Sequence, residues 1–165
     1  MGRLSILAEG LSKHVVTEKY PYEPVEVPEG FRGKPRIDPS RCVGCGACVN
    51  ACPPNALSIA DEGGYRVLKL FIGRCIFCGR CEEVCPFQAI KLSKEFELAA
   101  TDVGDLTQEV RLVMAKCAVC GEPYATLREV RKVAEALPDG LRALAYVCPR
   151  CRELMTSHYA GFARR

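Results

Sequence analysis

Short apolar blocks, each interrupted by one polar residue, recur in the middle of the chain. Blocks 56–59 and 89–92 share the order apolar, apolar, polar, apolar. Blocks of this length between turn-forming residues predict β-strands. Ile37 and Leu70 lie in a second pair of apolar blocks, one ahead of each of the first two. The pattern therefore predicts a small fold in which one strand–connection–strand unit occurs twice.

A helical period replaces this pattern near the C-terminus. Thr126-Leu127-Arg128-Glu129 is a capping box and predicts a helix start, and Pro138-Asp139-Gly140 predicts its end. The apolar stripe of the predicted helix is Leu127, Val130, Ala134 and Leu137, and its outward face is Arg128, Arg131, Lys132 and Glu135. Blocks 110–114 and 144–147 predict strands on either side of it.

The N-terminal residues 1–19 predict a short amphipathic helix. Its apolar stripe is Leu4, Leu7, Ala8, Leu11 and Val15, and Arg3, Lys13 and Lys19 lie around it. We expect this helix to dock on a partner subunit or to lie on a membrane surface; packing on its own core is the alternative. The following prolines, Pro21, Pro24, Pro28 and Pro35, oppose regular structure and predict an extended docking strap.

Charge and composition narrow the possible functions. The 165 residues carry a net charge of +3. A nucleic-acid-binding protein would have a concentrated basic patch, so nucleic-acid binding is not favoured. No apolar run approaches the roughly 18–20 residues of a membrane span. Twelve cysteines without a signal peptide indicate a reducing, cytoplasmic compartment.

Eight of the twelve cysteines belong to one motif that occurs twice. The first run, 42–53, and the second run, 75–86, both have the spacing C-x2-C-x2-C-x3-C-P. Bacterial proteins with two 4Fe–4S clusters use this spacing for their ligands. The repeat extends beyond the cysteines, since Gly46 and Gly79 occupy the same place in the two runs. The duplication predicts a domain with a pseudo-two-fold axis.

The spacing also predicts which cysteines share a cluster. Three cysteines of a run surround three corners of a cubane, and the fourth lies one helical turn further on and points to the other cluster. The predicted ligands are Cys42, Cys45, Cys48 and Cys85 for the first cluster, and Cys75, Cys78, Cys81 and Cys52 for the second. Disulfides or zinc are the alternatives. Disulfides suit secreted chains, and zinc ligands usually occur in pairs.

The remaining four cysteines form two C-x2-C pairs: Cys117, Cys120, Cys148 and Cys151. Two such pairs give a tetrahedral site, which most often holds one structural Zn²⁺. One mononuclear iron in a rubredoxin-like site is the alternative, as are four unliganded thiols. The stretch between the pairs is longer than the roughly 15–20 residues of a zinc ribbon, because it contains the predicted helix.

The predicted fold class is α+β, with a bacterial-type two-cluster ferredoxin core. Residues 1–34 form the N-terminal arm, with its amphipathic helix and proline-rich strap. Residues 35–100 form the ferredoxin domain. Residues 101–165 form a C-terminal zinc-ribbon or rubredoxin-like metal-binding segment.

Residues 20–100 resemble a known family. The motifs that carry the resemblance are Tyr20-Pro21, Glu23-Pro24 and Phe31-Arg32-Gly33-Lys34-Pro35, together with the second run and Ala89 to Ala99. They are similar to the two-cluster iron–sulfur subunits of formate hydrogenlyases, and those subunits resemble the ferredoxin-like subunit of respiratory complex I. The C-terminal cysteine pairs resemble the hydrogenlyase version.

The resemblance implies a subunit of a membrane-bound group 4 nickel–iron hydrogenase, peripheral on the cytoplasmic face of the membrane. It implies electron relay between an electron-input iron–sulfur subunit and the hydrogenase small subunit, beside a membrane arm. The chain itself would be non-catalytic. The alternatives are an interaction or scaffold subunit with structural clusters, and a freely diffusing ferredoxin.

Overall fold

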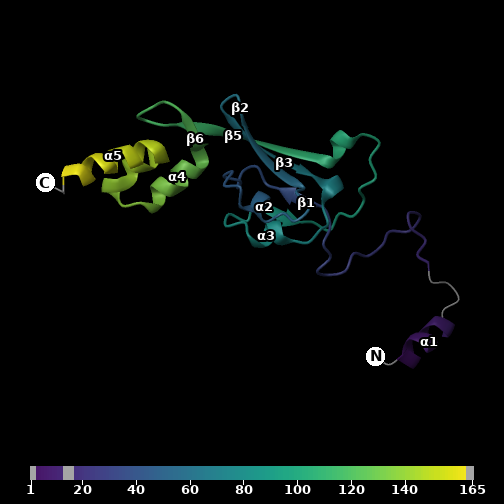
Figure 1. The fold of residues 1–165 in the computed structure, drawn as a ribbon. Helices are drawn as coiled ribbons and strands as arrows, with labels where there is room; N and C mark the ends of the chain where they lie inside the picture. Colours follow the sequence, from purple (N-terminus) through teal and green to yellow (C-terminus); the bar gives the residue numbers. More distant parts are fainter. Residues whose placement is uncertain (1–2, 13–16, 163–165) are drawn as a thin grey trace. The chain divides into compact units, whose positions relative to one another are not determined.

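The computed structural model of the protein describes residues 3–12 and 17–162 and divides the chain into two compact units (Figure 1). The first unit is Met1–Phe31 and the second is Arg32–Arg165. All twelve cysteines lie in the second unit. Within the described ranges, no helix combines the length and the apolar character needed to cross a bilayer.

The first unit begins with helix α1, Arg3–Ser12. The side chains of Leu4, Leu7 and Leu11 are exposed on it. The prediction that the helix extends to residue 19 is wrong, since residues 17–19 are not helical. The Lys19 carbonyl instead accepts the N–H groups of Tyr22 and Glu23 in a turn at the first proline. The prediction for Val15 lies outside the described residues. Residues 17–34 contain neither helix nor strand, which confirms the irregular strap.

Two antiparallel strand pairs form the centre of the second unit. Strand β1 (Pro35–Ile37) pairs with β4 (Ile90–Leu92), and β2 (Leu57–Glu62) pairs with β3 (Tyr65–Phe71). Ile37 faces Ile90, and Leu57 faces Leu70. In the internal repeat, position 37 corresponds to 70 and position 57 corresponds to 90. The residues that face each other in β1 and β4 are therefore the repeat equivalents of those that face each other in β3 and β2. The register therefore confirms the predicted pseudo-two-fold arrangement.

Each cysteine run contains one short helix, α2 (Ala47–Asn50) or α3 (Arg80–Glu83). Each helix follows a glycine in the left-handed conformation, Gly46 at φ 77° and Gly79 at φ 81°. L-residues with a Cβ rarely adopt this conformation. Both helices stop before the proline of their run, since proline cannot continue a helix. A 3-10 turn, η1 (Ile72–Arg74), leads into the second run.

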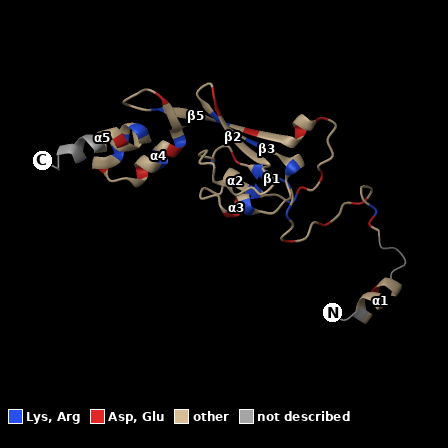
Figure 2. Cartoon of the chain, in the orientation of Figure 1, with Lys and Arg blue, Asp and Glu red and all other residues tan. Residues whose placement is uncertain are grey.

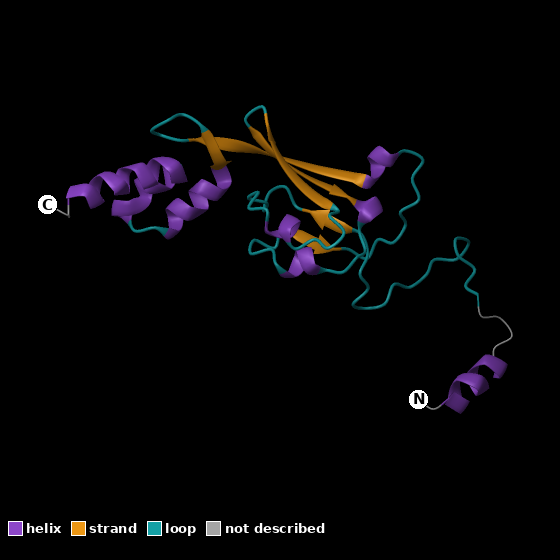
Figure 3. Cartoon of the chain, in the orientation of Figure 1, coloured by secondary structure: helices purple, strands orange, loops and turns teal. Residues whose placement is uncertain are grey.

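The C-terminal half extends the ferredoxin core. After a 3-10 turn, η2 (Val103–Leu106), strand β5 (Thr107–Lys116) pairs along the whole of β3, and β6 (Pro123–Thr126) pairs with β5. The resulting sheet has the order β2-β3-β5-β6. Its strands are drawn in orange in Figure 3. The strand predicted at 110–114 is confirmed and is longer. Its pairing with β3 was not predicted.

Helix α4 (Leu127–Ala136), a 3-10 helix η3 (Asp139–Tyr146) and helix α5 (Pro149–Phe162) complete the chain. The predicted helix start is confirmed, because the Thr126 hydroxyl accepts the Glu129 N–H at 3.2 Å as an N-cap. The strand predicted at 144–147 is wrong, since residues 144–146 belong to η3 and Val147 lies in a bend. Residues 139–146 wind as a 3-10 helix, which buries Ala145 against Val130 and Ala134 of α4.

The main hydrophobic core joins both halves of the second unit. Leu57, Leu68 and Leu70 of β2 and β3 pack in one cluster with Val110 and Leu112 of β5. The partly buried cysteines of both runs border the same cluster. The sheet extension therefore supports the cysteine-lined region directly.

This shared core predicts a contrast between two neighbouring positions of β5. Leu112→Ala should lower the stability of the full chain by about 2–5 kcal/mol, because it opens a cavity in the core. Val113→Ala is the matched control, since Val113 is 54% exposed, and it should change stability by less than about 0.5 kcal/mol. Thermal unfolding under nitrogen measures both. Equal losses would contradict the packing of β5.

Candidate iron–sulfur and metal sites

Four cysteines from different parts of the repeat line one cavity, which we call the first cavity. They are Cys42, Cys45, Cys48 and Cys85. Ile37, Leu68 and Ile90 supply apolar wall, and the cavity spans about 350 Å³ including space open to solvent. The structure thus brings the last cysteine of the second run beside the first three of the first run.

The second cavity has the reciprocal composition. Its cysteines are Cys52, Cys75, Cys78 and Cys81, and Leu57, Leu70 and Leu92 contribute apolar wall. It also spans about 350 Å³ including space open to solvent. Each half of the repeat therefore provides three thiols to one cavity and one thiol to the other.

Backbone N–H groups point at the sulfur atoms. The Ala56 N–H donates to Cys52 Sγ at 3.3 Å, and the repeat-related Ala89 N–H donates to Cys85 Sγ at 3.2 Å. The Phe77 N–H reaches Cys75 Sγ at 3.4 Å. Such donors stabilise negative charge on sulfur and tune the potential of iron–sulfur centres.

Burial opposes ionisation of one or more thiols in each cavity. Burial, together with the neighbouring Cys42, Cys45 and Cys85, raises the pKa of Cys48 to about 12. Burial, with Cys75 adding to it, raises the pKa of Cys81 to about 11. Iron supplies the positive charge that converts such thiols to thiolates. Four thiols, apolar walls and N–H donors are the environment that a 4Fe–4S cluster requires.

The two cysteine runs and the residues just after them share unusual backbone conformations at equivalent positions of the repeat. Gly44 (φ 77°) and Phe77 (φ 54°) occupy equivalent positions of the repeat, as do Asn55 (φ 52°) and Gln88 (φ 49°). Glycine is required only at position 44. An added Cβ would lie 2.8 Å from both Leu112 Cδ1 and Thr126 Cγ2.

The C-terminal segment holds the loop that begins the first run. We define residues 39–44 as the first loop. The Thr126 hydroxyl donates to the Val43 carbonyl, and Arg128 Nη1 donates to the carbonyls of Pro39, Ser40 (3.3 Å) and Cys42 (3.2 Å). The sequence placed Arg128 only on the outward face of a helix. It missed these contacts because they join segments that lie far apart along the chain.

The positive charge that Arg66 places near the first loop is partly compensated by Asp61. Arg66 Nη1 donates to the Gly44 carbonyl at 3.4 Å, and its other nitrogens bind Asp61 at 2.7 and 2.8 Å. Burial raises the pKa of Cys42, while the Gly44 N–H and the positive charge of Arg128 oppose that rise. Lys and Arg are otherwise interspersed with Asp and Glu along the chain (Figure 2).

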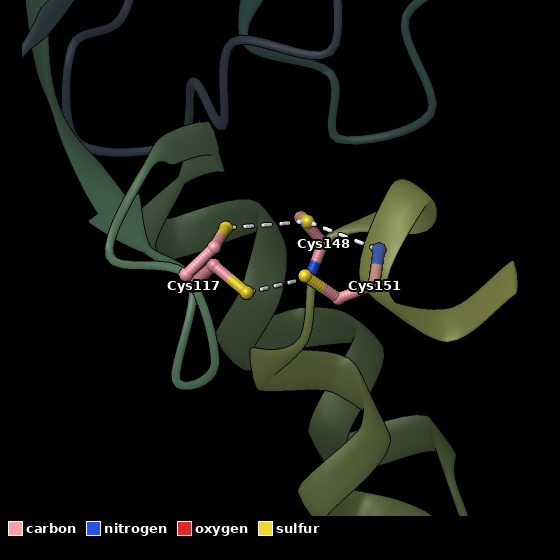
Figure 4. Close-up of side chains that lie close together, drawn as sticks. Cys117, Cys148 and Cys151 are labelled. Atoms are coloured by element: carbon pink, nitrogen blue, oxygen red, sulfur yellow. Dashed lines mark hydrogen bonds between the residues drawn. The ribbon is translucent and has the colours of Figure 1, made fainter. Parts of the chain in front are cut away.

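A third cysteine group lies where β5, the following turn and the start of α5 meet. The Sγ atoms of Cys117, Cys120, Cys148 and Cys151 all lie within 4.8 Å of one another. The labelled side chains of Cys117, Cys148 and Cys151 point toward one another (Figure 4). These three are buried, and Cys120 is exposed.

N–H groups also reach this third group. Cys117 Sγ accepts the N–H of Cys148 at 3.2 Å and of Val119 at 3.4 Å. Backbone donors, those of Cys120 and Cys148 first, lower the pKa of Cys117 to about 6. A buried sulfur that readily ionises, surrounded by three others, is suited to binding a metal cation.

The fold and the two cysteine-lined cavities define an α+β, ferredoxin-like iron–sulfur protein. Two family models, each described as a 4Fe-4S dicluster domain, match residues 35–92 and 74–125. Formate hydrogenlyase subunit 6 of Escherichia coli (strain K12) is 43% identical over 145 residues, which cover 82% of this chain and 81% of the relative.

Two further comparisons give lower identities. The NAD(P)H-quinone oxidoreductase subunit I of Trichodesmium erythraeum (strain IMS101) is 37% identical over 146 residues, 82% of this chain and 69% of the relative. A chain in the structure of the membrane-bound sulfane sulfur reductase, an archaeal respiratory membrane complex, aligns at a TM-score of 0.45 and 30% identity, covering 62% of this chain and 56% of that one.

The chain belongs to the family of 4Fe–4S dicluster subunits that includes formate hydrogenlyase subunit 6 and the subunit I proteins of quinone oxidoreductases. This confirms the family predicted from residues 20–100. The two 4Fe–4S dicluster domains make electron relay the role of this chain.

The packing at Gly44 predicts a position-specific loss of stability. Gly44→Ala should cost about 2–4 kcal/mol, because left-handed strain of about 1–2 kcal/mol adds to overpacking against Leu112 and Thr126. Gly63→Ala is the control, since Gly63 is left-handed (φ 57°) with no atom within 4 Å of an added Cβ. Thermal unfolding under nitrogen compares the two variants. A Gly44→Ala loss no larger than the control's would refute the close contact.

Proposed function

We propose that this chain passes single electrons through two 4Fe–4S clusters, between an electron-input iron–sulfur subunit and the hydrogenase small subunit of a membrane-bound hydrogenase complex. The observation that carries the proposal is the pair of cavities, each lined by four cysteines from both halves of the repeat. The identity with formate hydrogenlyase subunit 6 supports the choice of a hydrogenase complex.

The proposed ligands follow the two cavities. Cys42, Cys45, Cys48 and Cys85 hold the first cluster, and Cys52, Cys75, Cys78 and Cys81 hold the second. A bound 4Fe–4S cluster supplies reversible one-electron oxidation and reduction. Because each run contributes to both cavities, the backbone connects the two sites directly.

The residues around the cavities set the conditions for electron transfer. The N–H groups of Ala56, Phe77 and Ala89 stabilise charge on ligand sulfurs. The apolar walls limit water around the clusters, and water access is one of the properties that set a cluster's potential. The chain has a relay role and supplies no substrate chemistry of its own in this proposal.

The proposed location is peripheral, on the cytoplasmic face of the membrane, beside the membrane arm of the complex. Exposed Leu4, Leu7 and Leu11 on α1 support docking to a partner subunit. A groove lined by Arg41, Arg128, Arg131 and Lys132, together with Val43 of the first loop, supports contact with an acidic partner surface near the first cavity.

The proposed occupant of the third cysteine group is one structural Zn²⁺ held by Cys117, Cys120, Cys148 and Cys151. Support comes from the mutual approach of the four sulfurs and the burial of three of them. A single iron in a rubredoxin-like site is the alternative, because iron accepts the same four-sulfur geometry.

Because each run is proposed to supply ligands to both clusters, each Cys→Ser variant should alter one defined cluster. Wild-type protein prepared without oxygen should take up about two electrons per chain reversibly, one for each cluster. Cys52→Ser should alter the same cluster as Cys78→Ser and leave intact the cluster that Cys45→Ser alters. Coulometric titration monitored by electron paramagnetic resonance measures electron uptake and identifies each signal.

Asn50→Ser, at an exposed position of α2, is the control and should retain both signals. A Cys52→Ser spectrum that matches Cys45→Ser would contradict the crossed assignment. Clusters that are present in wild-type protein but cannot be reduced reversibly would refute electron relay and favour a scaffold.

The third cysteine group predicts a separable metal. Cys148→Ser should remove about one zinc per chain while both clusters remain, because its sulfur lines neither cavity. Val119→Ser, an exposed change in the same turn, is the control. Elemental analysis of iron, sulfide and zinc checks both variants. Unchanged metal content in Cys148→Ser would refute the site, and loss of one iron in place of zinc would favour the rubredoxin-like alternative.

A further inference from the structure

The two cluster loops are related by the repeat, but only the first is held by the C-terminal segment. Arg128 at the start of α4 donates to the carbonyls of Pro39, Ser40 and Cys42. The repeat-related carbonyls are those of Ile72, Gly73 and Cys75. Among residues 32–156, no side chain donates to these three carbonyls. The second run has a different arginine contact, in which Arg32 Nη1 donates to the Cys78 carbonyl at 3.4 Å. Arg128 therefore distinguishes the segment that leads into the first run from its repeat-related counterpart.

The charge of Arg128 differs from that of Arg66, the other arginine that donates to a carbonyl of the first loop. Arg66 is neutralised by Asp61 at 2.7 Å and lies 3.8 Å from Glu129. No carboxylate among the described side chains forms an ion pair with a nitrogen of Arg128. Arginine stays protonated at any working pH. A permanent and uncompensated positive charge is therefore hydrogen-bonded to the backbone of a cysteine, Cys42, that lines the first cavity.

A fixed positive charge acts unequally on the two redox states of a cluster. Reduction adds one negative charge, so a nearby cation stabilises the reduced state more than the oxidised state. The result is a higher reduction potential. Because electrostatic interaction weakens with distance and with screening by water, the effect should be concentrated on the nearer cluster.

We propose that Arg128 is a positioning residue for the first cluster, which holds the first loop and raises the reduction potential of that cluster selectively. The C-terminal segment, by this means, contributes to the difference in potential between the two relay sites. The inference rests on the proposed function, because it requires a cluster held by Cys42, Cys45, Cys48 and Cys85.

The direct test is the potential of each cluster in the full chain after Arg128→Gln, which removes the charge and keeps an N–H donor. At a fixed potential, the ratio of reduced to oxidised first cluster should fall roughly three- to tenfold, where tenfold corresponds to about 59 mV for one electron. The second cluster should not change. Redox titration monitored by electron paramagnetic resonance gives both ratios, and Cys45→Ser identifies the first cluster's signal.

Two variants separate charge from general disturbance. Arg128→Lys keeps the charge and should keep the ratio within about twofold of wild type, a change of about 18 mV or less for one electron. Arg142→Gln removes an arginine on η3 that binds Asp139 and the Leu137 carbonyl, and it should change neither cluster. An unchanged first ratio in Arg128→Gln, or an equal shift of both clusters, would overturn the proposal.

A second variant removes a negative charge from α4, and it tests the electrostatic effect if the Arg128→Gln protein does not assemble the first cluster. Glu129→Gln removes a carboxylate that lies 3.8 Å from Arg66 Nη1, so the first cluster should become easier to reduce while the second stays constant. An unchanged ratio of reduced to oxidised first cluster in Glu129→Gln would overturn the proposal that charges on α4 affect the potential of this cluster. Wild-type protein without reducible clusters would instead refute the proposed function itself.

Discussion

The crowding of four thiols in each of two cavities is the constraint on which the structure depends. Buried cysteines resist ionisation, as the rise of the Cys48 pKa to about 12 shows, but cluster ligands must be thiolates. In the proposed ligation, iron resolves this conflict and also links the two halves of the chain, since Cys85 lies with the first run and Cys52 with the second. Cluster insertion and folding of the core should therefore be strongly coupled.

The internal repeat makes the two sites alike, and the C-terminal segment makes them different. The register of β1 with β4 and of β2 with β3, and the left-handed pair Gly44 and Phe77, follow the repeat closely. Of the four strands in the repeat, β3 is the one that pairs with β5. Thr126 and Arg128 donate hydrogen bonds to carbonyls of the first loop, and among residues 32–156 neither side chain donates to the repeat-related carbonyls of the second run. Gly44 in place of a larger residue is the local consequence of that packing. Because the surroundings of a cluster set its potential, this difference in packing gives the two proposed clusters different conditions.

Local sequence predicted the features that depend on local chemistry. Cysteine spacing predicted two matching runs, and the capping box at Thr126 predicted the start of α4. The pairing of β5 with β3 could not be predicted, because any apolar strand could have occupied that edge. The apolar block at 144–147 resembles a strand, but packing of Ala145 on α4 winds residues 144–146 as a 3-10 helix. Arg128 looked like an ordinary outward-facing residue, because its partners lie in a distant part of the chain.

The central claim is that thiols from both halves of the duplication hold two clusters near enough to exchange electrons. The electron paramagnetic resonance spectrum of the fully reduced wild-type protein, prepared without oxygen, tests this most directly. We expect two reduced 4Fe–4S centres whose signals are broadened and split by magnetic interaction with each other. Two sharp, independent spectra, or a folded chain that contains no inorganic sulfide, would contradict the account.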